Sequence, residues 1–192
     1  MEIYKAKQAL RKDMAAKKSA FTGTELLDRS ALILNRLEEC LLFQSAERVA
    51  LYHALPGEVQ TAAFIERWYL RKQLFLPLVE GDNLRLLRYT GPESLRKGAF
   101  GIWEPKPDGE EAEEDEIELI IVPGVAFDAQ CHRLGRGRGF YDRLLSSLHA
   151  PKVGICFDFQ LVPFVPVEPF DRQMDYVVAE RGIYSINEIG YR

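Results

Sequence analysis

A nine-residue apolar run, LIIVPGVAF over residues 119–127, constrains the fold more than any other feature of the 192-residue chain. A strand that is apolar on both faces is typical of a parallel sheet covered by helices, because a sheet with one face in water alternates apolar and polar residues. Shorter apolar runs lie at 48–55, 152–159 and 175–180. We therefore expect these runs to be strands of one sheet.

Segments with helical periodicity separate the apolar runs. Residues 2–21 repeat apolar positions at helical spacing, and further helices are expected to begin after Thr24 and after Thr61, both suitable helix caps. A fourth helix is expected over residues 140–148. Strands that alternate with helices favour a three-layer arrangement in which the sheet is covered on both sides.

Two other segments complete the expected organisation. The turn sequence EGDN joins two further predicted strands, 73–79 and 84–90, and the acidic segment 106–118 is expected to be a solvated loop. With 47% hydrophobic and 28% charged residues, the chain has the composition of a globular protein with a sizeable core. The predicted fold is a single α/β/α domain over residues 1–192 with a central, mostly parallel sheet.

Charge and composition disfavour several functional classes. A net charge of −4 disfavours a general nucleic-acid partner, and the longest apolar run is far too short to span a membrane. The start of the chain has no apolar core of a secretory signal, and the three cysteines are too few and too scattered for a disulfide framework. We therefore expect a reduced cytoplasmic protein with neither a nucleic acid nor a membrane partner. Small-molecule partners and a monomeric state are further expectations that do not rest on these observations.

An unusual loop, RLGRGRGFYDRLL, follows the most apolar predicted strand and leads into a helix. Exposed N–H groups and the helix dipole favour anions at a helix start, glycines let the backbone approach a ligand, and arginines bind phosphate or carboxylate through paired N–H groups. Asp142, in the first helical turn, could hold Mg²⁺ beside a phosphate. The alternative is a tightly packed turn with Asp142 placed there by the dipole alone. The loop matches neither the Walker A sequence nor G-x-G-x-x-G, since Phe140 occupies the last glycine position.

Three other stretches could complete a site, and each has a structural alternative. Glu58, in the turn LPGEVQT, could accept hydrogen bonds from a ligand or be a charge at a helix entry. Asp171 and Asp175 lie in the proline-rich VPVEPFDRQMD, which could fix a carboxylate or merely cross the surface. Lys7 and Arg11, one helical turn apart, could reach a phosphate together or be solvated.

The sequence lacks the residue patterns of a zinc site and of a serine nucleophile. The three histidines are scattered, and only Cys131 and His132 are adjacent, a spacing that suits a tetrahedral zinc site poorly. The sequence also contains no G-x-S-x-G nucleophile motif.

These pieces together resemble the 5-formyltetrahydrofolate cyclo-ligase family, also called methenyltetrahydrofolate synthetase. The matching stretches are KQALR (7–11), LPGEVQT (55–61), PGVAFDAQCHRLGRGRGFYDRLL (123–145) and VPVEPFDRQMDYVVAE (165–180), and their order runs through nearly the whole chain. The resemblance implies closure of 5-formyltetrahydrofolate to 5,10-methenyltetrahydrofolate with ATP and Mg²⁺, giving ADP and phosphate through a phosphorylated formyl group.

The resemblance also assigns roles to residues. Catalysis would use Arg136, Tyr141 and Asp142, and Mg²⁺ would be held by Asp142 and Asp171. The ATP-binding residues would be Lys7, Arg11, Arg133, Leu134, Gly135, Arg136, Gly137, Arg138, Gly139, Phe140 and Tyr141. The folate would contact His53, Glu58, Arg136, Gly137, Arg138, Gly139 and Phe140.

Two positions depart from the family pattern. Cys131 stands where the family usually has glycine, and a positive φ there would cost about 1 kcal/mol or more. Arg138 interrupts a run that is often all glycine, and its charge could strengthen phosphate or folate-carboxylate binding. Two rival functions are disfavoured. The presence of Glu58, Lys7, Arg11 and both aspartates speaks against a folate- or nucleotide-binding regulator without turnover, and the negative net charge and the lack of a repeated RGG tract speak against an RNA-binding protein that uses GRGRG.

Overall fold

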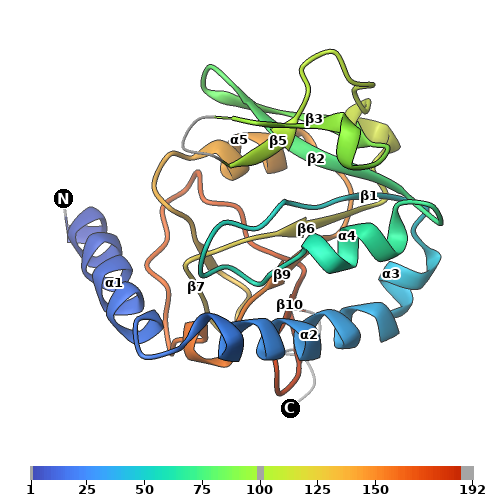
Figure 1. Cartoon of the computed structure of the whole chain (residues 1–192). Coiled ribbons are helices and arrows are strands. Elements are labelled where there is room, and N and C mark those ends of the chain that lie inside the picture. Colours follow the sequence, from blue (N-terminus) through green and yellow to red (C-terminus); the bar gives the residue numbers. More distant parts are fainter. Residues whose placement is uncertain (1, 99–101, 187–192) are drawn as a thin grey trace.

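The computed structural model describes residues 2–98 and 102–186 (Figure 1). The helices are α1 (Glu2–Lys18), α2 (Gly23–Glu39), α3 (Leu41–Ser45), α4 (Ala62–Trp68) and α5 (Phe140–Ser147), with 3-10 turns η1 (Pro92–Ser94), η3 (Glu114–Glu116) and η4 (Asp158–Gln160). The strands are β1 (Arg48–Ala50), β2 (Gln73–Glu80), β3 (Asn83–Tyr89), β4 (Leu95–Lys97), β5 (Trp103–Pro105), β6 (Leu119–Val122), β7 (Ala126–Phe127), β8 (Arg133–Leu134), β9 (Lys152–Ile155), β10 (Tyr176–Val178) and β11 (Ile183–Ser185).

The central sheet is mostly parallel, as the sequence predicts. Its strand order among the described residues is β11-β10-β9-β6-β1-β2-β3. The pairings from β10 through β9, β6 and β1 to β2 are all parallel, whereas β11 and β3 pair antiparallel at the two edges. The expected α/β class with a parallel core is confirmed.

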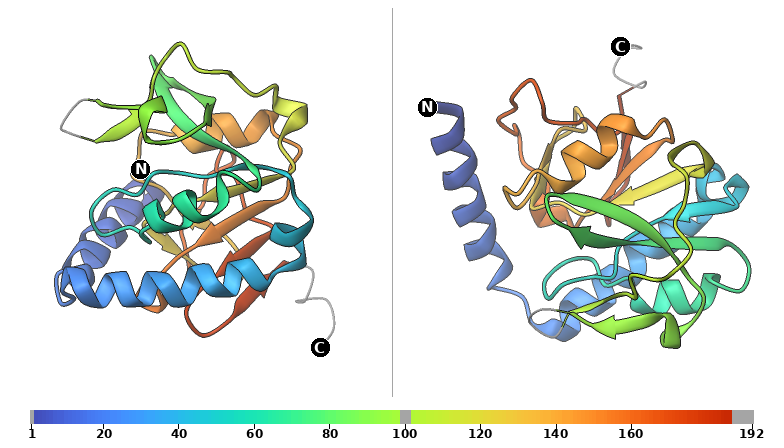
Figure 2. Two further views of the ribbon diagram at one scale, coloured as in Figure 1. Left: turned by 45° about the vertical axis from the view of Figure 1, so that its right-hand side comes forward. Right: turned by 90° about the horizontal axis from the view of Figure 1, so that it is seen from above.

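Helices cover both faces of the sheet (Figure 2). Because successive strand residues point to opposite faces, Val49 and Ile121 join one core cluster with residues of α2, α3 and α4. Ala50, Ile120 and Val122 belong to a second cluster with residues of α5. The three-layer arrangement therefore follows from strands that are apolar on both faces.

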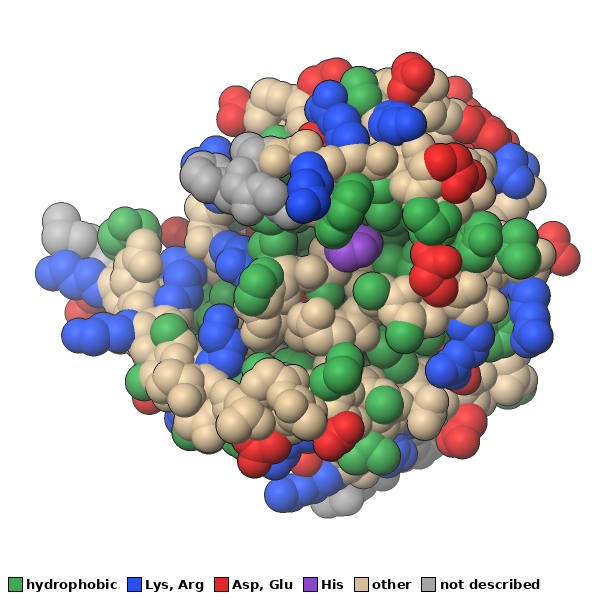
Figure 3. Space-filling model, in the orientation of Figure 1, with side chains coloured by type: hydrophobic (Ala, Val, Ile, Leu, Met, Phe, Trp, Pro, Cys, Tyr) green, Lys and Arg blue, Asp and Glu red, His purple; other side chains and the backbone are tan. Residues whose placement is uncertain are grey.

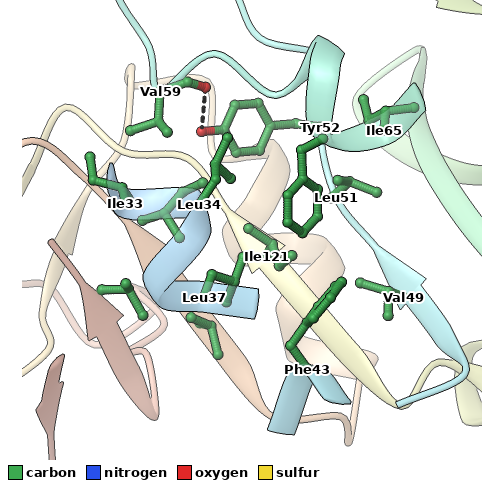
Figure 4. Close-up of a cluster of buried hydrophobic side chains, with 14 of the residues drawn as sticks. Ile33, Leu34, Leu37, Phe43, Val49, Leu51, Tyr52, Val59, Ile65 and Ile121 are labelled. Carbon is green, nitrogen blue, oxygen red and sulfur yellow. Dashed lines mark hydrogen bonds between the residues drawn. The ribbon is translucent and has the colours of Figure 1, made fainter. Parts of the chain in front are cut away.

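The first cluster also braces the loop that follows β1. Figure 4 shows Tyr52 among the buried side chains, where its hydroxyl donates a hydrogen bond to Val59 O at 3.2 Å. The Thr61 hydroxyl donates to Tyr52 O at 2.6 Å and accepts the Ala54 N–H at 3.2 Å. These bonds fix both ends of the loop that carries Glu58.

Two predicted helix caps differ from the structure. Helix α2 begins at Gly23 with Thr22 as its cap, not after Thr24, because Thr22 and Glu25 form a reciprocal capping box. Thr61 does precede α4, but its hydroxyl makes no cap bond since Tyr52 O and the Ala54 N–H occupy it.

Several predicted segments are shorter than expected. The helix predicted over 2–21 ends at Lys18, and the strand predicted over 48–55 ends at Ala50. The apolar run 119–127 divides into β6 and β7, because Pro123 has no N–H for the ladder; β7 pairs instead with β8 in a separate two-stranded ribbon. The acidic segment 106–118 is mostly exposed but contains η3.

Helix α1 lies to one side of the layered body (Figures 1 and 2). Its buried Met14 packs in a small cluster with Ala126, Leu134 and Val165. This contact places α1 against the β7–β8 ribbon, directly beside the arginine- and glycine-rich loop. No helix among residues 2–98 and 102–186 is long and apolar enough to cross a membrane.

Candidate active site

The arginine- and glycine-rich loop connects β8 to the first turn of α5. Gly137 has a φ of 104° and Gly139, at the N-cap of α5, has a φ of 70°. Both values lie in the left-handed region, which glycine adopts without the steric cost of a side chain. The expected positive φ is therefore confirmed at these two glycines.

Arg133 lies beneath the loop rather than in it. Its guanidinium is buried, with Nη1 donating to Pro123 O at 3.3 Å and Nη2 donating to Asp142 Oδ1 at 3.1 Å. Its Nε has no partner among the described atoms. Arg133 thus holds Asp142 in the first turn of α5.

The other two arginines of the loop are exposed. Arg136 donates to Glu58 Oε1 through Nε at 3.2 Å and Nη2 at 2.9 Å. The guanidinium of Arg138 stacks over the Phe140 ring at 5.6 Å and makes no ion pair with a described carboxylate. Its positive charge is therefore available to a ligand.

A tight turn presents Glu58 to the loop. Gly57 has a φ of 80°, as the third position of a type II turn requires, and the Glu58 N–H donates to Leu55 O at 3.1 Å. Glu58 Oε2 accepts the Leu55 N–H at 2.9 Å, which leaves Oε1 for Arg136. The alternative of a simple helix-entry charge fits poorly with this carboxylate, whose side chain is only 11% exposed.

Tyr141 lies near the same carboxylate. Burial and the negative charge of Glu58 raise the pKa of the Tyr141 phenol, against a lowering effect of Arg133. The phenol therefore stays protonated at neutral pH and can donate a hydrogen bond but cannot act as a base.

Helix α1 contributes Lys7 and Arg11 to this region. Lys7 is buried, and its Nζ lies 2.7 Å from Glu168 Oε2 and 2.5 Å from Asp171 Oδ2. Burial lowers the pKa of Lys7, but its hydrogen bonds to the two carboxylates outweigh this effect and the pKa is raised. Arg11 Nε donates to Gly135 O at 2.9 Å. The alternative of a solvated pair is wrong for Lys7.

Asp142 and Asp171 lie on neighbouring segments. The backbone N–H of Arg172, which follows Asp171, donates to Asp142 Oδ1 at 3.1 Å. Within residues 2–98 and 102–186 no group of three or more His, Cys, Asp or Glu side chains forms a metal cluster. A site for Mg²⁺ at these two aspartates stays a prediction, one that suits an ion usually held by one or two carboxylates together with phosphates.

Two pockets lie beside the loop that joins β1 to α4. One, of about 270 Å³, is lined by Arg11, Lys18, Glu58, Arg136 and Phe159 among others. The second, of about 190 Å³, is more apolar and is lined by His53, Ile65, Glu66, Tyr89, Leu95 and Trp103 among others. In Figure 3, Lys and Arg side chains gather where α1 meets the body.

His53 lies apart from the pocket that contains Glu58, although both were expected to contact one ligand. Burial lowers the pKa of the His53 imidazole, against a raising effect of Glu66, so the ring is neutral at pH 7. The two residues belong to the same loop between β1 and α4 but line different pockets.

Sequence reasoning missed several residues that line these pockets. Lys18 continues the stripe of Lys7 and Arg11 by two more turns of α1, so helical spacing alone could have found it. Phe159 and Trp103 come from distant segments whose sequences contain no motif for such a role.

Cys131, which stands where the family usually has glycine, adopts the strained positive φ that the sequence analysis considered. Its φ is 63°, and it is the only described non-glycine residue with a positive φ. The side chain is fully buried, and the thiol donates to Tyr184 O at 3.6 Å.

Comparisons with known proteins agree on one family. The model of the 5-formyltetrahydrofolate cyclo-ligase family matches residues 3–180. The 5-formyltetrahydrofolate cyclo-ligase of Mycolicibacterium smegmatis is 38% identical over 153 residues, 74% of this chain and 78% of that protein. The enzyme of that name from Escherichia coli K12 is 35% identical over 148 residues, 73% of this chain and 81% of that protein.

A solved structure shares the fold as well. The 5,10-methenyltetrahydrofolate synthetase of Aquifex aeolicus has a TM-score of 0.85 and 36% identity, covering 94% of this chain and 92% of that one. The chain therefore belongs to the 5-formyltetrahydrofolate cyclo-ligase family.

Proposed function

We propose that the protein catalyses the ATP- and Mg²⁺-dependent cyclisation of 5-formyltetrahydrofolate to 5,10-methenyltetrahydrofolate, with release of ADP and phosphate. The observation that carries this proposal is the contact between Arg136 and Glu58 at 2.9 Å. It brings a cationic loop suited to phosphate within hydrogen-bond distance of a carboxylate suited to a pterin. Family membership supplies the folate substrate.

The phosphates of ATP would bind along the loop between β8 and α5. The start of α5, the positive-φ glycines and the free charge of Arg138 together favour an anion at this position. Arg11 adds a guanidinium from α1, since only its Nε is used by Gly135 O. Phosphoryl transfer depends mainly on such cations and on positioning, which is consistent with the missing protein nucleophile.

Asp142 and Asp171 would hold Mg²⁺ against the phosphates. The ion, when bound, would neutralise part of the charge on the triphosphate. Arg133 orients Asp142 at 3.1 Å, and Lys7 orients Asp171 at 2.5 Å. Both carboxylates are thus held in place before a ligand arrives.

The folate would bind across the Glu58 turn. Glu58 Oε1 would accept hydrogen bonds from the N–H groups of the pterin, and it must then share or release Arg136. The protonated phenol of Tyr141 is a neutral donor near the same position. The apolar pocket beside His53 suits an aromatic part of the substrate.

The chemistry then needs no covalent bond to the protein. The formyl oxygen attacks the γ-phosphorus, an O–P bond forms, and the bond to the bridging oxygen breaks with its electron pair leaving on ADP. The neighbouring side-chain amine then attacks the formyl carbon and loses its proton, and phosphate departs with the former formyl oxygen. Arg136 and Arg138 would stabilise the charge on the transferring group.

The test is an absorbance assay. Purified protein is mixed with 5-formyltetrahydrofolate and MgATP, and the methenyl product is followed in the near ultraviolet. Product should form only when nucleotide and divalent cation are both present. Tight binding of folate or nucleotide without turnover would identify a regulator instead, and equal turnover in excess chelator would contradict the role of Mg²⁺.

A further inference from the structure

Lys18 lies on the same face of α1 as Lys7 and Arg11. The spacings from residue 7 to 11, 14 and 18 are four, seven and eleven, so all four side chains line one stripe of the helix. At a rise of about 1.5 Å per residue, this stripe is about 16 Å long. Lys7 and Met14 are buried, whereas Arg11 and Lys18 are half-buried and line the 270 Å³ pocket.

The Lys18 ammonium has no partner in the part of the chain that the structure describes. It makes no hydrogen bond or ion pair with any described residue, unlike Lys7, which contacts two carboxylates. Among the described residues, the pocket is lined by three cations, Arg11, Lys18 and Arg136, and by one carboxylate, Glu58, which already forms an ion pair with Arg136. This imbalance of charge favours an anionic ligand in the pocket.

The Glu58 turn fixes where the Lys18 ammonium lies. A Cβ added at Gly57 would lie 2.5 Å from Lys18 Cδ and 2.8 Å from its Nζ, so the lysine packs directly against this glycine. Arg11, in contrast, contacts the loop at Gly135 and comes within 3.4 Å of a Cβ added at Gly137. The stripe on α1 therefore runs from Arg11, beside the arginine- and glycine-rich loop, to Lys18, beside the Glu58 turn.

We propose that Lys18 binds the γ-phosphate of ATP and remains with it during transfer to the formyl oxygen. The proposal rests on the proposed function, in which the loop binds the triphosphate and Glu58 binds the pterin. The γ-phosphate is the part of ATP that must meet the folate, so it lies at the end of the triphosphate nearest Glu58. Lys18 is the cation of α1 at that end, and its three N–H donors suit the equatorial oxygens of a phosphoryl group.

The test compares nucleotides with and without a γ-phosphate. Isothermal titration calorimetry measures the Kd of Mg-ADP, of the non-hydrolysable analogue Mg-AMP-PNP and of 5-formyltetrahydrofolate for wild type, Lys18→Ala and Lys18→Arg. Lys18→Ala should weaken AMP-PNP binding by about tenfold or more, the loss of one charge-assisted contact, and change ADP binding less than about twofold. Lys18→Arg should recover most of the difference.

Lys17→Ala is the matched control. Lys17 is on the same helix and carries the same charge, but it is exposed and pairs with Asp13 at 3.1 Å. It should change neither Kd. The assignment to the γ-phosphate would be overturned if Lys18→Ala weakened the binding of ADP and of AMP-PNP equally. It would also be overturned if Lys18→Ala weakened only the binding of 5-formyltetrahydrofolate. Failure of the wild type to bind either nucleotide would overturn the proposed function itself.

Discussion

Replacing Glu58 with glutamine tests the proposed role of this residue in folate binding and preserves the shape of the Glu58 turn. Glutamine has nearly the same volume, and its carbonyl oxygen can still accept the Leu55 N–H that Glu58 Oε2 accepts at 2.9 Å. What the change removes is the negative charge that faces Arg136 and, in the proposed complex, the pterin N–H groups. The variant therefore separates recognition from folding.

The expected magnitude follows from these contacts. A hydrogen bond to a charged group contributes about 1.5–3 kcal/mol, so the Kd of 5-formyltetrahydrofolate should rise by about tenfold to 150-fold. The pair with Arg136, whose side chain is 53% exposed, contributes about 1 kcal/mol or less, so the melting temperature should fall by at most about 4 °C. Since Glu58 competes with phosphate for Arg136, AMP-PNP should bind as well as before or more tightly.

Calorimetry with each ligand and a thermal melt measure all three quantities. Glu39→Gln is the control, because Glu39 is exposed at the end of α2 and its carboxylate has no described partner. A folate Kd within twofold of wild type would refute the role of Glu58. Equal weakening of folate binding and AMP-PNP binding would also refute this role, because it indicates damage to the whole site.

Three further predictions concern single residues. Lys7→Met leaves two carboxylates unpaired, which costs about 3–5 kcal/mol, and should lower the melting temperature by about 6–20 °C. Since folding raises the pKa of Lys7, this stabilisation is present below pH 10.5 and is lost as pH rises through the folded pKa. If wild type and Lys7→Met differed as much in melting temperature at higher pH as at lower pH, the ion pair would be contradicted. Arg138→Gly should raise the KM for ATP or folate about tenfold with little change in melting temperature, and an unchanged KM would make Arg138 irrelevant to binding. Burial raises the pKa of Cys131 to about 11 and that of Cys156 far above its usual range, so a thiol reagent should label only Cys40 in the native protein at pH 8; fast labelling of a second thiol would contradict this burial.

The sheet could be predicted because burial on two faces leaves a direct mark in the sequence. Val49 and Ala50 are both apolar although they point to opposite core clusters, and the same holds for Ile120 and Ile121. The ends of elements were less predictable, because they depend on local bonds. Thr22 caps α2 through its pairing with Glu25, for example.

The site was predicted as a set of residues but not as an arrangement. Motif matching brought Glu58 and Arg136 into one set, and the structure places them 2.9 Å apart. The inward position of Arg133 could not be foreseen, since three similar arginines on one loop differ only in their tertiary surroundings. Lys18 was missed because it belongs to no motif, although its helical spacing from Arg11 is regular.

In the proposed reaction, the formyl oxygen of the folate receives the γ-phosphoryl group in the pocket between α1 and the Glu58 turn. Transfer of ¹⁸O from the formyl group to phosphate distinguishes this route from others. The protein is given MgATP and 5-formyltetrahydrofolate labelled with ¹⁸O in the formyl group, and the released inorganic phosphate is analysed by mass spectrometry. Each phosphate formed with the methenyl product should contain one ¹⁸O atom. Product accompanied by unlabelled phosphate, with the ¹⁸O recovered in water, would contradict it.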